Sequence, residues 1–232
     1  MGKIMYTEKS ATGGEINHIA GVVTYVGERI VNDIKVANIG TTLSVYNPET
    51  KSYDNKYLSI GFWNSTDETK PQLADNVLKA RVAKGSFLMM VVGELKENDP
   101  ATDGTARLSA RGLYFTYNGK RELKNENGEV IYNLFCGTAC NPRESEGVFD
   151  LNIPINTRAG AETETTWYSI RFTNNDKNTL ADQATKLMNN KVPVCILTDA
   201  VVDKVTETQV FHNTNGVKFA AGFAKEAPAQ PE

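Results

Sequence analysis

Alternating apolar and polar residues, the pattern of a half-buried β-strand, recur along the first half of the chain. Within residues 56–63, Leu58, Ile60 and Phe62 fall on one face and Trp63 falls on the other. The pattern predicts strands over 16–26, 34–46, 56–63, 86–95 and 105–117, with an amphipathic helix over 71–82 between the third and fourth.

The second half repeats this order. Strands are predicted over 130–140, 148–157, 165–173 and 192–202, a helix over 180–188, and a final hairpin over 209–223 that turns at Asn213–Gly216. An internal repeat of about a hundred residues indicates a duplicated domain, because solenoid repeats are much shorter.

Three strands, a helix and two more strands is the element order of the OB-fold, a small Greek-key barrel that often binds oligonucleotides. Other small barrels share this order. We therefore predict a mainly β protein with two tandem OB-fold (five-stranded Greek-key) barrels, each with one helix between strands 3 and 4. The predicted parts are a flexible arm (1–15), a first barrel (16–119), a linker (120–129), a second barrel (130–224) and a short tail (225–232).

Composition narrows the classes of function. With 40% hydrophobic and 23% charged residues and a net charge of −3, the chain is an ordinary globular protein that would not bind nucleic acid through net charge alone. The longest strongly apolar run, residues 87–92, is too short to span a membrane, so we expect a soluble, cytoplasmic protein. Three cysteines exclude a disulfide scaffold, and two histidines argue against His-based metal sites and catalysis.

Four segments of the first half resemble the bacterial single-stranded DNA-binding protein family. Val36–Ser44 (VANIGTTLS) and Tyr57–Asn64 (YLSIGFWN) resemble its second and third strands, Ala74–Ser86 its helix, and Val91–Leu95 (VVGEL) its fourth strand. The second half repeats the resemblance more faintly at Asn133–Gly137, Phe149–Asn156, Thr165–Phe172 and Ala181–Pro193, where Val-Pro replaces the family's Gly-Ser.

The resemblance implies a sequence-tolerant single-stranded DNA-binding protein that coats strands exposed in replication, recombination or repair, in a bacterial cell or a phage-infected host. It also implies the tandem form of the family, in which two chains supply four barrels as a homodimer. The tail Lys225–Glu232 lacks the family's acidic, apolar-tipped ending, which puts the usual recruitment of replication or recombination proteins in doubt.

Binding a single strand without sequence preference requires aromatic rings for base stacking and cations along the backbone. Both tryptophans fall on the polar face of a predicted third strand, and the family often has aromatic residues near its hairpins. The aromatic candidates are Tyr46, Tyr53, Tyr57, Trp63, Trp167 and Phe211. The basic candidates are Lys35, Lys56, Arg107, Arg111, Arg143, Arg158, Arg171 and Lys218. The alternatives are aromatic rings that pack at a barrel end or in a turn, and solvated surface charges.

No catalytic, cofactor or metal site is predicted. Cys136 and Cys140 have the spacing of half a zinc site, but no second pair accompanies them. Two other functions stay open. The barrels could mainly bind other proteins, which the acidic net charge favours, or form a nuclease, which no cluster of carboxylates supports.

Overall fold

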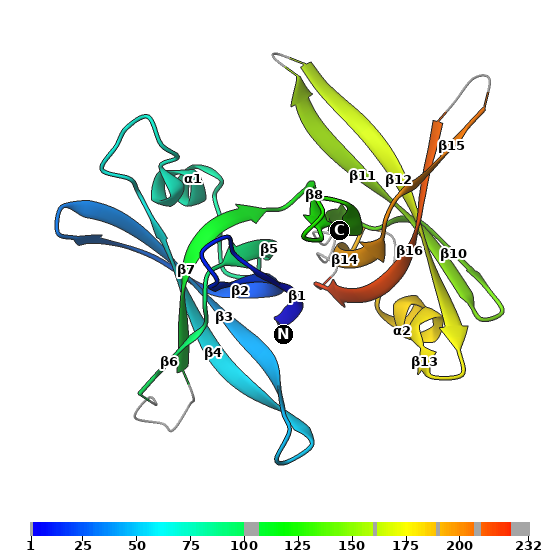
Figure 1. Cartoon of the computed structure of the whole chain (residues 1–232), viewed down its shortest axis with the longest axis horizontal. Coiled ribbons are helices and arrows are strands. Elements are labelled where there is room, and N and C mark those ends of the chain that lie inside the picture. Colours follow the sequence, from blue (N-terminus) through cyan, green and yellow to red (C-terminus); the bar gives the residue numbers. More distant parts are fainter. Residues whose placement is uncertain (1, 100–106, 160–161, 189–190, 207–209, 224–232) are drawn as a thin grey trace, which may run out of the picture. The chain divides into compact units, whose positions relative to one another are not determined.

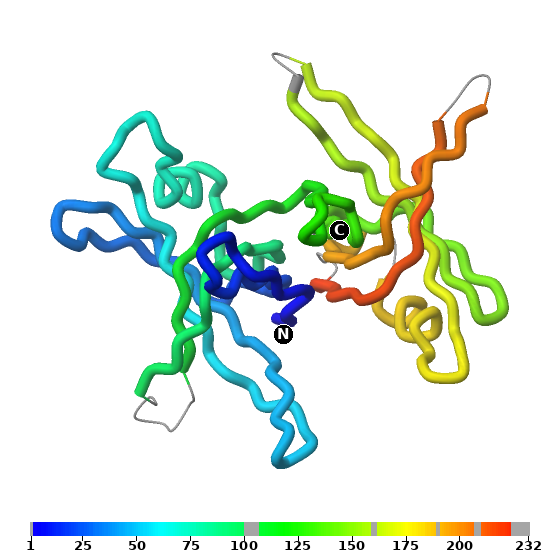
Figure 2. The backbone as a smooth tube through the Cα atoms, in the orientation of Figure 1, coloured from blue at the N-terminus to red at the C-terminus, as the bar shows by residue number. Residues whose placement is uncertain are grey.

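The computed structural model describes residues 2–99, 107–159, 162–188, 191–206 and 210–223, and these residues form mainly β-strands. The mainly β prediction is therefore confirmed. The chain divides into two compact units, Met1–Tyr117 (unit 1) and Asn118–Glu232 (unit 2). Figure 1 labels their helices and strands, and Figure 2 shows the path of the backbone.

Unit 1 is organised around five strands whose pairing closes on itself. β2 pairs with β3, β3 with β4, β4 with β7, β7 with β5, and β5 again with β2. Within this ring only the β4–β7 pair is parallel. The strands are β1 (Lys3–Lys9), β2 (Glu15–Val31), β3 (Ile34–Asn47), β4 (Ser52–Trp63), β5 (Phe87–Val92), β6 (Lys96–Asn98) and β7 (Arg107–Thr116).

The long strand β2 closes the ring because its first part pairs with one neighbouring strand and its second part pairs with another. Residues 17–22 pair with β5, a register shift follows between Val23 and Tyr25, and the remaining residues pair with β3. A two-residue turn joins β2 to β3, and its residues Asn32 and Asp33 have φ angles of 49° and 63°. Asn and Asp tolerate this left-handed conformation, which suits the twist of a hairpin.

One helix, α1 (Leu73–Lys79), lies between β4 and β5 and buries Ala74 and Val77 against the barrel core. The helix was predicted over 71–82. It ends earlier because Arg81 takes a left-handed φ of 54°, which breaks the helical hydrogen-bond pattern. The apolar faces of the strands fill the interior, as the alternation predicted.

Unit 2 repeats the arrangement with a divided first strand. β9 pairs with β14, and after Ala139 the chain continues as β10, which pairs with β11. β11 pairs with β12, β12 with β16 in parallel, and β16 with β14. The elements are β8 (Gly119–Lys124), β9 (Val130–Thr138), β10 (Cys140–Ser145), β11 (Val148–Ala159), β12 (Glu162–Asn175), β13 (Asn178–Thr179), α2 (Leu180–Leu187), β14 (Pro193–Asp199), β15 (Val202–Val205) and β16 (Val210–Ala221).

Equivalent positions of the two units can be matched through close contacts in their cores. A Cβ atom at Gly112 would collide with the ring of Phe62, and one at Gly216 would collide with the ring of Phe172. Both phenylalanines are buried on the strand that pairs in parallel with the glycine's strand. Counting from these pairs, Trp167 occupies the position of Tyr57.

The segments predicted as a flexible arm and a linker both contain β-strands. Residues 3–9, placed in a flexible arm, form β1, which pairs with the first half of β2. Residues 120–124, placed in a linker, belong to β8, which pairs with β9. Both segments carry many charged residues and little alternation, so only pairing with a neighbouring strand makes them β-strands.

The predicted final hairpin turns elsewhere. Asn213–Gly216 lies inside β16, and Val205 pairs with Val210, so the hairpin does not turn at Asn213–Gly216. The predicted strand 192–202 ends at Asp199, and β15 begins at Val202. Asn and Gly favour turns, but here β16 is held between β12 and β15 on its two sides. The tail, residues 225–232, lies outside the described residues.

Candidate nucleic-acid interface

The outer face of the β2–β3–β4 sheet in unit 1 carries five aromatic side chains. Residues that pair across strands point to the same face, and the core residues Leu58, Ile60 and Phe62 define the inner one. The outer face therefore receives Tyr25 from β2, Tyr46 from β3, and Tyr53, Tyr57 and Trp63 from β4. Figure 1 shows the β3–β4 hairpin, which bears four of them, projecting from the barrel.

Glycines make room for three of these rings. A Cβ atom at Gly40 would collide with the ring of Tyr57, and one at Gly27 with the ring of Tyr25. A Cβ atom at Gly61 would lie 3.1 Å from Nε1 of Trp63. The rings therefore lie over bare backbone on the sheet.

The tyrosines of this face differ in exposure. Tyr25 is 54% exposed, and the Tyr46 and Tyr53 rings form an exposed edge-to-face pair with centroids 5.4 Å apart. Tyr57 is half-buried, and burial is the main cause that raises the pKa of its hydroxyl, with Tyr25 contributing and Arg107 opposing. The hydroxyl of Tyr57 therefore lies near both Tyr25 and Arg107.

Three arginines accompany the rings. Arg107 pairs with Tyr57 and Arg111 with Gly61 across the parallel β4–β7 contact, and Arg29 pairs with Val36 across the β2–β3 contact. All three are exposed, and none forms an ion pair with another described residue. Their guanidinium groups are thus available to phosphate.

Two hollows adjoin Trp63 and Arg111. One of about 310 Å³ is lined by residues of this face, including Arg29, Asn38 and Lys96. The other, of about 530 Å³, is bordered by Ile34 and by Trp63, Asn64 and the residues that follow them. Both are open depressions of the sheet surface beside an aromatic ring and a cation.

Lys35 and Lys56, both predicted to bind DNA, have other partners. Lys35 Nζ lies 2.9 Å from Asp75 Oδ1, and this hydrogen bond raises the pKa of Lys35 and lowers that of Asp75. Lys56 Nζ lies 2.7 Å from Glu97 Oε1, which lowers the pKa of Glu97. Both lysines alternate with the outer-face residues, so their strand positions direct them away from the aromatic rings.

The outer face of unit 2 has fewer aromatic residues and more amides. Trp167, 51% exposed, shares the outer face of β12 with Ser169 and Arg171, and the buried Ile170 and Phe172 face inward. The predicted orientation of Trp167 is therefore confirmed. Its ring is the counterpart of Tyr57 in unit 1.

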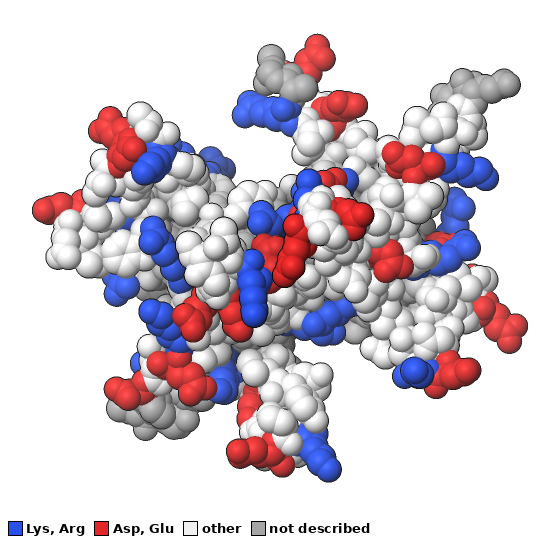
Figure 3. Space-filling model, viewed as in Figure 1, with Lys and Arg blue, Asp and Glu red and all other residues white. Residues whose placement is uncertain are grey.

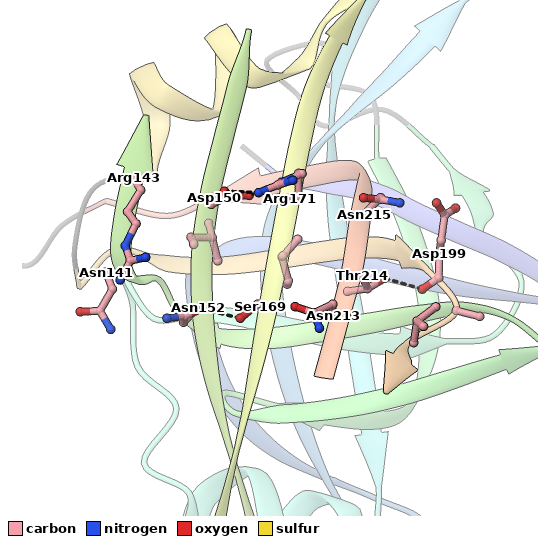
Figure 4. A pocket seen from close by; sticks show the side chains of 14 residues that line it. Asn141, Arg143, Asp150, Asn152, Ser169, Arg171, Asp199, Asn213, Thr214 and Asn215 are labelled. Atoms are coloured by element: carbon pink, nitrogen blue, oxygen red, sulfur yellow. Dashed lines mark hydrogen bonds and ion pairs between the residues drawn. The ribbon is translucent and has the colours of Figure 1, made fainter. Parts of the chain in front are cut away.

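Beyond Trp167 the face is hollowed into a polar pocket of about 800 Å³ (Figure 4). Its side chains come from β10, β11, β12, β16 and the segment around Asp199. The lining includes Asn141, Arg143, Asp150, Asn152, Ser169, Arg171, Asn213 and Asn215, and it contains no aromatic ring. Asn152 Oδ1 accepts a 2.9 Å hydrogen bond from the Ser169 hydroxyl, and Asp199 O accepts one of 2.8 Å from the Thr214 hydroxyl.

Arg171 is held by Asp150. Its Nε and Nη2 atoms each donate a 2.8 Å hydrogen bond to one carboxylate oxygen, and this contact raises the pKa of Arg171. Arg143 lies opposite Asp150 in the β10–β11 pair and forms no ion pair with a described residue. One of the two predicted arginines of this pocket is therefore already neutralised.

The remaining predicted residues of unit 2 are spread out. Arg158 is exposed on the far part of β11, opposite Thr163. Phe211 is exposed on β16, opposite Lys204. Lys218 lies in the part of β16 that pairs with β14, outside the pocket. Arg143 and Arg171 therefore lie together in the pocket. Arg158, Phe211 and Lys218 do not belong to its lining.

Tyr25, Arg29 and Asp150 are site residues that the sequence pattern did not predict. Tyr25 and Arg29 lie in the second half of β2, beyond the register shift that resets the alternation, so the strand pattern read from residue 16 gave them no clear face. For Asp150, the strand pattern predicts only that the side chain lies on the face opposite the core. Its opposition to Arg171 depends on the β11–β12 register.

Positive and negative side chains are interspersed on the face shown in Figure 3. Among the described residues, no group of three or more His, Cys, Asp or Glu side chains is placed to hold a metal ion. In the same part of the chain, no helix has the length and apolar character needed to cross a membrane. Comparison of the sequence with protein-family models and with curated proteins found no match.

Proposed function

We propose that the chain binds single-stranded DNA on the outer faces of its two sheets, without strict sequence preference, and that each unit is an OB-fold. The strand order supports the fold proposal. In unit 1, β2 pairs with both β3 and β5, and β4 pairs in parallel with β7. This is the connectivity of a five-stranded Greek-key barrel.

The observation that carries the proposal is the row of aromatic rings on one face of unit 1, with arginines beside it. Exposed rings cost free energy in water, so several together on one face mark a binding surface. Base–aromatic stacking contributes about 1–3 kcal/mol per base and tolerates any base, because every base has a π-face.

The arrangement suggests how a strand would be held. Bases would stack on Tyr57, Trp63 and the exposed Tyr25, while Arg107 and Arg111 on the neighbouring strand β7 would contact phosphates. The glycines beneath the rings leave the ring faces free to meet a base. Unit 2 would add Trp167 and the arginine-lined pocket as a second, less aromatic contact surface.

A fluorescence titration tests the proposal. The two tryptophans lie on the two candidate faces, so oligo(dT) should quench intrinsic fluorescence, and affinity should fall as salt rises because bound arginines release counterions from the strand. Trp63→Phe and Trp167→Phe each leave one reporter and assign the signal to one unit. A duplex of the same length is the control ligand and should bind more weakly. Absence of both quenching and a mobility shift at low salt would refute DNA binding.

A protein–protein interaction module is the second candidate. Val202, Val205 and Val210 are exposed on the β15–β16 ribbon, where a DNA-binding surface would carry cations. Under this alternative the chain would bind oligonucleotides weakly or not at all, and Val205→Ser would weaken association with a protein partner.

A further inference from the structure

A row of four side chains crosses the pocket of unit 2. The strand registers place Arg143, Asp150, Arg171 and Asn215 side by side on β10, β11, β12 and β16. Figure 4 shows Asp150 and Arg171 facing each other across neighbouring strands, with Asn215 beyond them. A single carboxylate thus lies between two guanidinium groups.

The bond between Asp150 and Arg171 uses the geometry that arginine offers to phosphate. Two parallel N–H···O bonds of 2.8 Å fill the Nε–Nη2 edge of the guanidinium. A phosphate group binds the same edge in the same bidentate manner. Both partners are solvent-accessible, Arg171 58% and Asp150 36%, so a competing anion can reach the bond.

The matching row of unit 1 has no carboxylate. There Gly27, Asn38, Gly61 and Arg111 occupy the equivalent places on β2, β3, β4 and β7. Asn38 stands where unit 2 has Asp150, and Arg111 is exposed with no ion pair to a described residue. The two units therefore differ in that one arginine of the unit 2 row, Arg171, is occupied by a carboxylate of the same row, and Arg111 of unit 1 is not.

We propose that Asp150 is an internal competitor of backbone phosphate at Arg171, which makes unit 2 the weaker and less salt-dependent of two nucleic-acid sites. This inference rests on the proposed function. Phosphate can bind the Nε–Nη2 edge of Arg171 only by displacing Asp150, and the charge of Arg171, already neutralised, then releases fewer counterions from the strand. Unit 1 would engage a strand first, and unit 2 would follow at higher strand concentration.

The test uses Trp63→Phe, which leaves Trp167 as the reporter of unit 2. In that background Asp150→Asn should tighten oligo(dT) binding about three- to tenfold at low salt. The slope of log affinity against log salt should steepen by about 0.7, the value for one additional phosphate contact on a single strand. Asp150→Ser serves as a second variant should the asparagine disturb the fold, which circular dichroism would reveal.

Two further variants separate a local effect from a change of net charge. Asp176→Asn removes one exposed negative charge from the turn after β12 and should leave the slope unchanged. In the Trp167→Phe background, Asn38→Asp introduces the carboxylate into unit 1 and should weaken binding there several-fold. An equal gain from Asp176→Asn and Asp150→Asn would overturn the proposal.

The possible failures are distinguishable. If the parent variant binds oligo(dT) and Asp150→Asn changes neither affinity nor slope, the competitor role is wrong and the proposed function stands. If neither the parent nor the unmodified chain binds at low salt, the proposed function falls and this inference falls with it.

Discussion

Tyr57 and Trp167 illustrate how one register position can keep its character through a duplication. Each is an aromatic residue on the outer face of the strand that pairs in parallel with the last strand of its unit. Their neighbours differ, because Tyr57 is half-buried beside Tyr25, and Trp167 lies opposite Pro154 with Thr165 and Ser169 next to it on the same face. The side of the strand therefore separates an exposed ring, which we propose binds a base, from a ring that packs in the core.

Trp167→Ala should weaken oligo(dT) binding by about 1–3 kcal/mol, the contribution of one base stack, and leave the fold nearly intact. Phe172→Ala should do the reverse and cost about 3–5 kcal/mol of unfolding free energy, because Phe172 is fully buried. Titration and chemical denaturation of both variants measure the contrast. If Trp167→Ala unfolds the protein and the folded fraction binds normally, the face assignment in unit 2 is wrong.

The three cysteines should react at very different rates. Cys195 and Cys136 are buried opposite each other on β14 and β9, and burial raises the pKa of the Cys195 thiol well above its usual range, with Cys136 adding to the effect. Cys140 is partly exposed. Because the thiolate is the reactive form, a disulfide reagent at neutral pH should label Cys140 first and the other two only after unfolding. Rapid labelling of folded Cys140→Ser would contradict this.

At the scale of elements, both helices are capped by an asparagine at the end of β4 or β12 rather than by their own N-cap. Asn64 directly follows β4, and Asn174 lies near the end of β12. The N-cap residues Gln72 and Thr179 make no side-chain capping bond. Instead Asn64 Oδ1 accepts a 3.1 Å hydrogen bond from the Asp75 amide, and Asn174 Oδ1 accepts one of 2.9 Å from the Ala181 amide. The asparagines thereby tie each helix to the end of the barrel's third strand.

Asn64→Ala and Asn174→Ala should each lower the unfolding free energy by about 1 kcal/mol, the usual cost of a lost helix cap. Denaturant titration measures the loss. Asn127→Ala, in an exposed turn where the side chain makes no hydrogen bond with a described residue, is the matched control and should change stability by less than about 0.5 kcal/mol. Equal effects at all three positions would exclude a capping role.

At the scale of the whole molecule, each chain offers two candidate binding faces of unequal chemistry. One is aromatic, with arginines that form no ion pair with a described residue, and the other is rich in amides, with one arginine neutralised. Two linked sites raise overall affinity through effective concentration, even where one site alone is weak. Unequal faces would then let a chain hold a strand through unit 1 and extend along it through unit 2.

We expect the chain to assemble as a homodimer, so that four such faces act together. Light scattering at micromolar concentration should then give about twice the chain mass of 25.5 kDa. β1 and β8 are edge strands, which leave backbone groups on one side for pairing with another chain. A monomer at that concentration would contradict the dimer and leave the DNA-binding proposal untouched.

Apolar alternation was sufficient to predict most of the barrel strands, both helices and the internal repeat, because it is a local consequence of which side of a strand faces the core. For the same reason it placed Trp63 and Trp167 on outer faces. Charged segments such as residues 3–9 and 120–124 could not be recognised as strands, because their β-structure comes from the neighbour with which they pair.

The tertiary structure decided which polar residues meet across strands. The sequence identifies Lys35 and Lys56 as cations, but it does not identify their partners. Their ion pairs with Asp75 and Glu97 join residues about forty positions apart. The register of β11 and β12 likewise sets Asp150 against Arg171, and that of β2 and β3 brings Tyr25 over to Gly40 and the ring of Tyr57. Cross-strand neighbours depend on register, and register is fixed only when the complete sheet buries its apolar face.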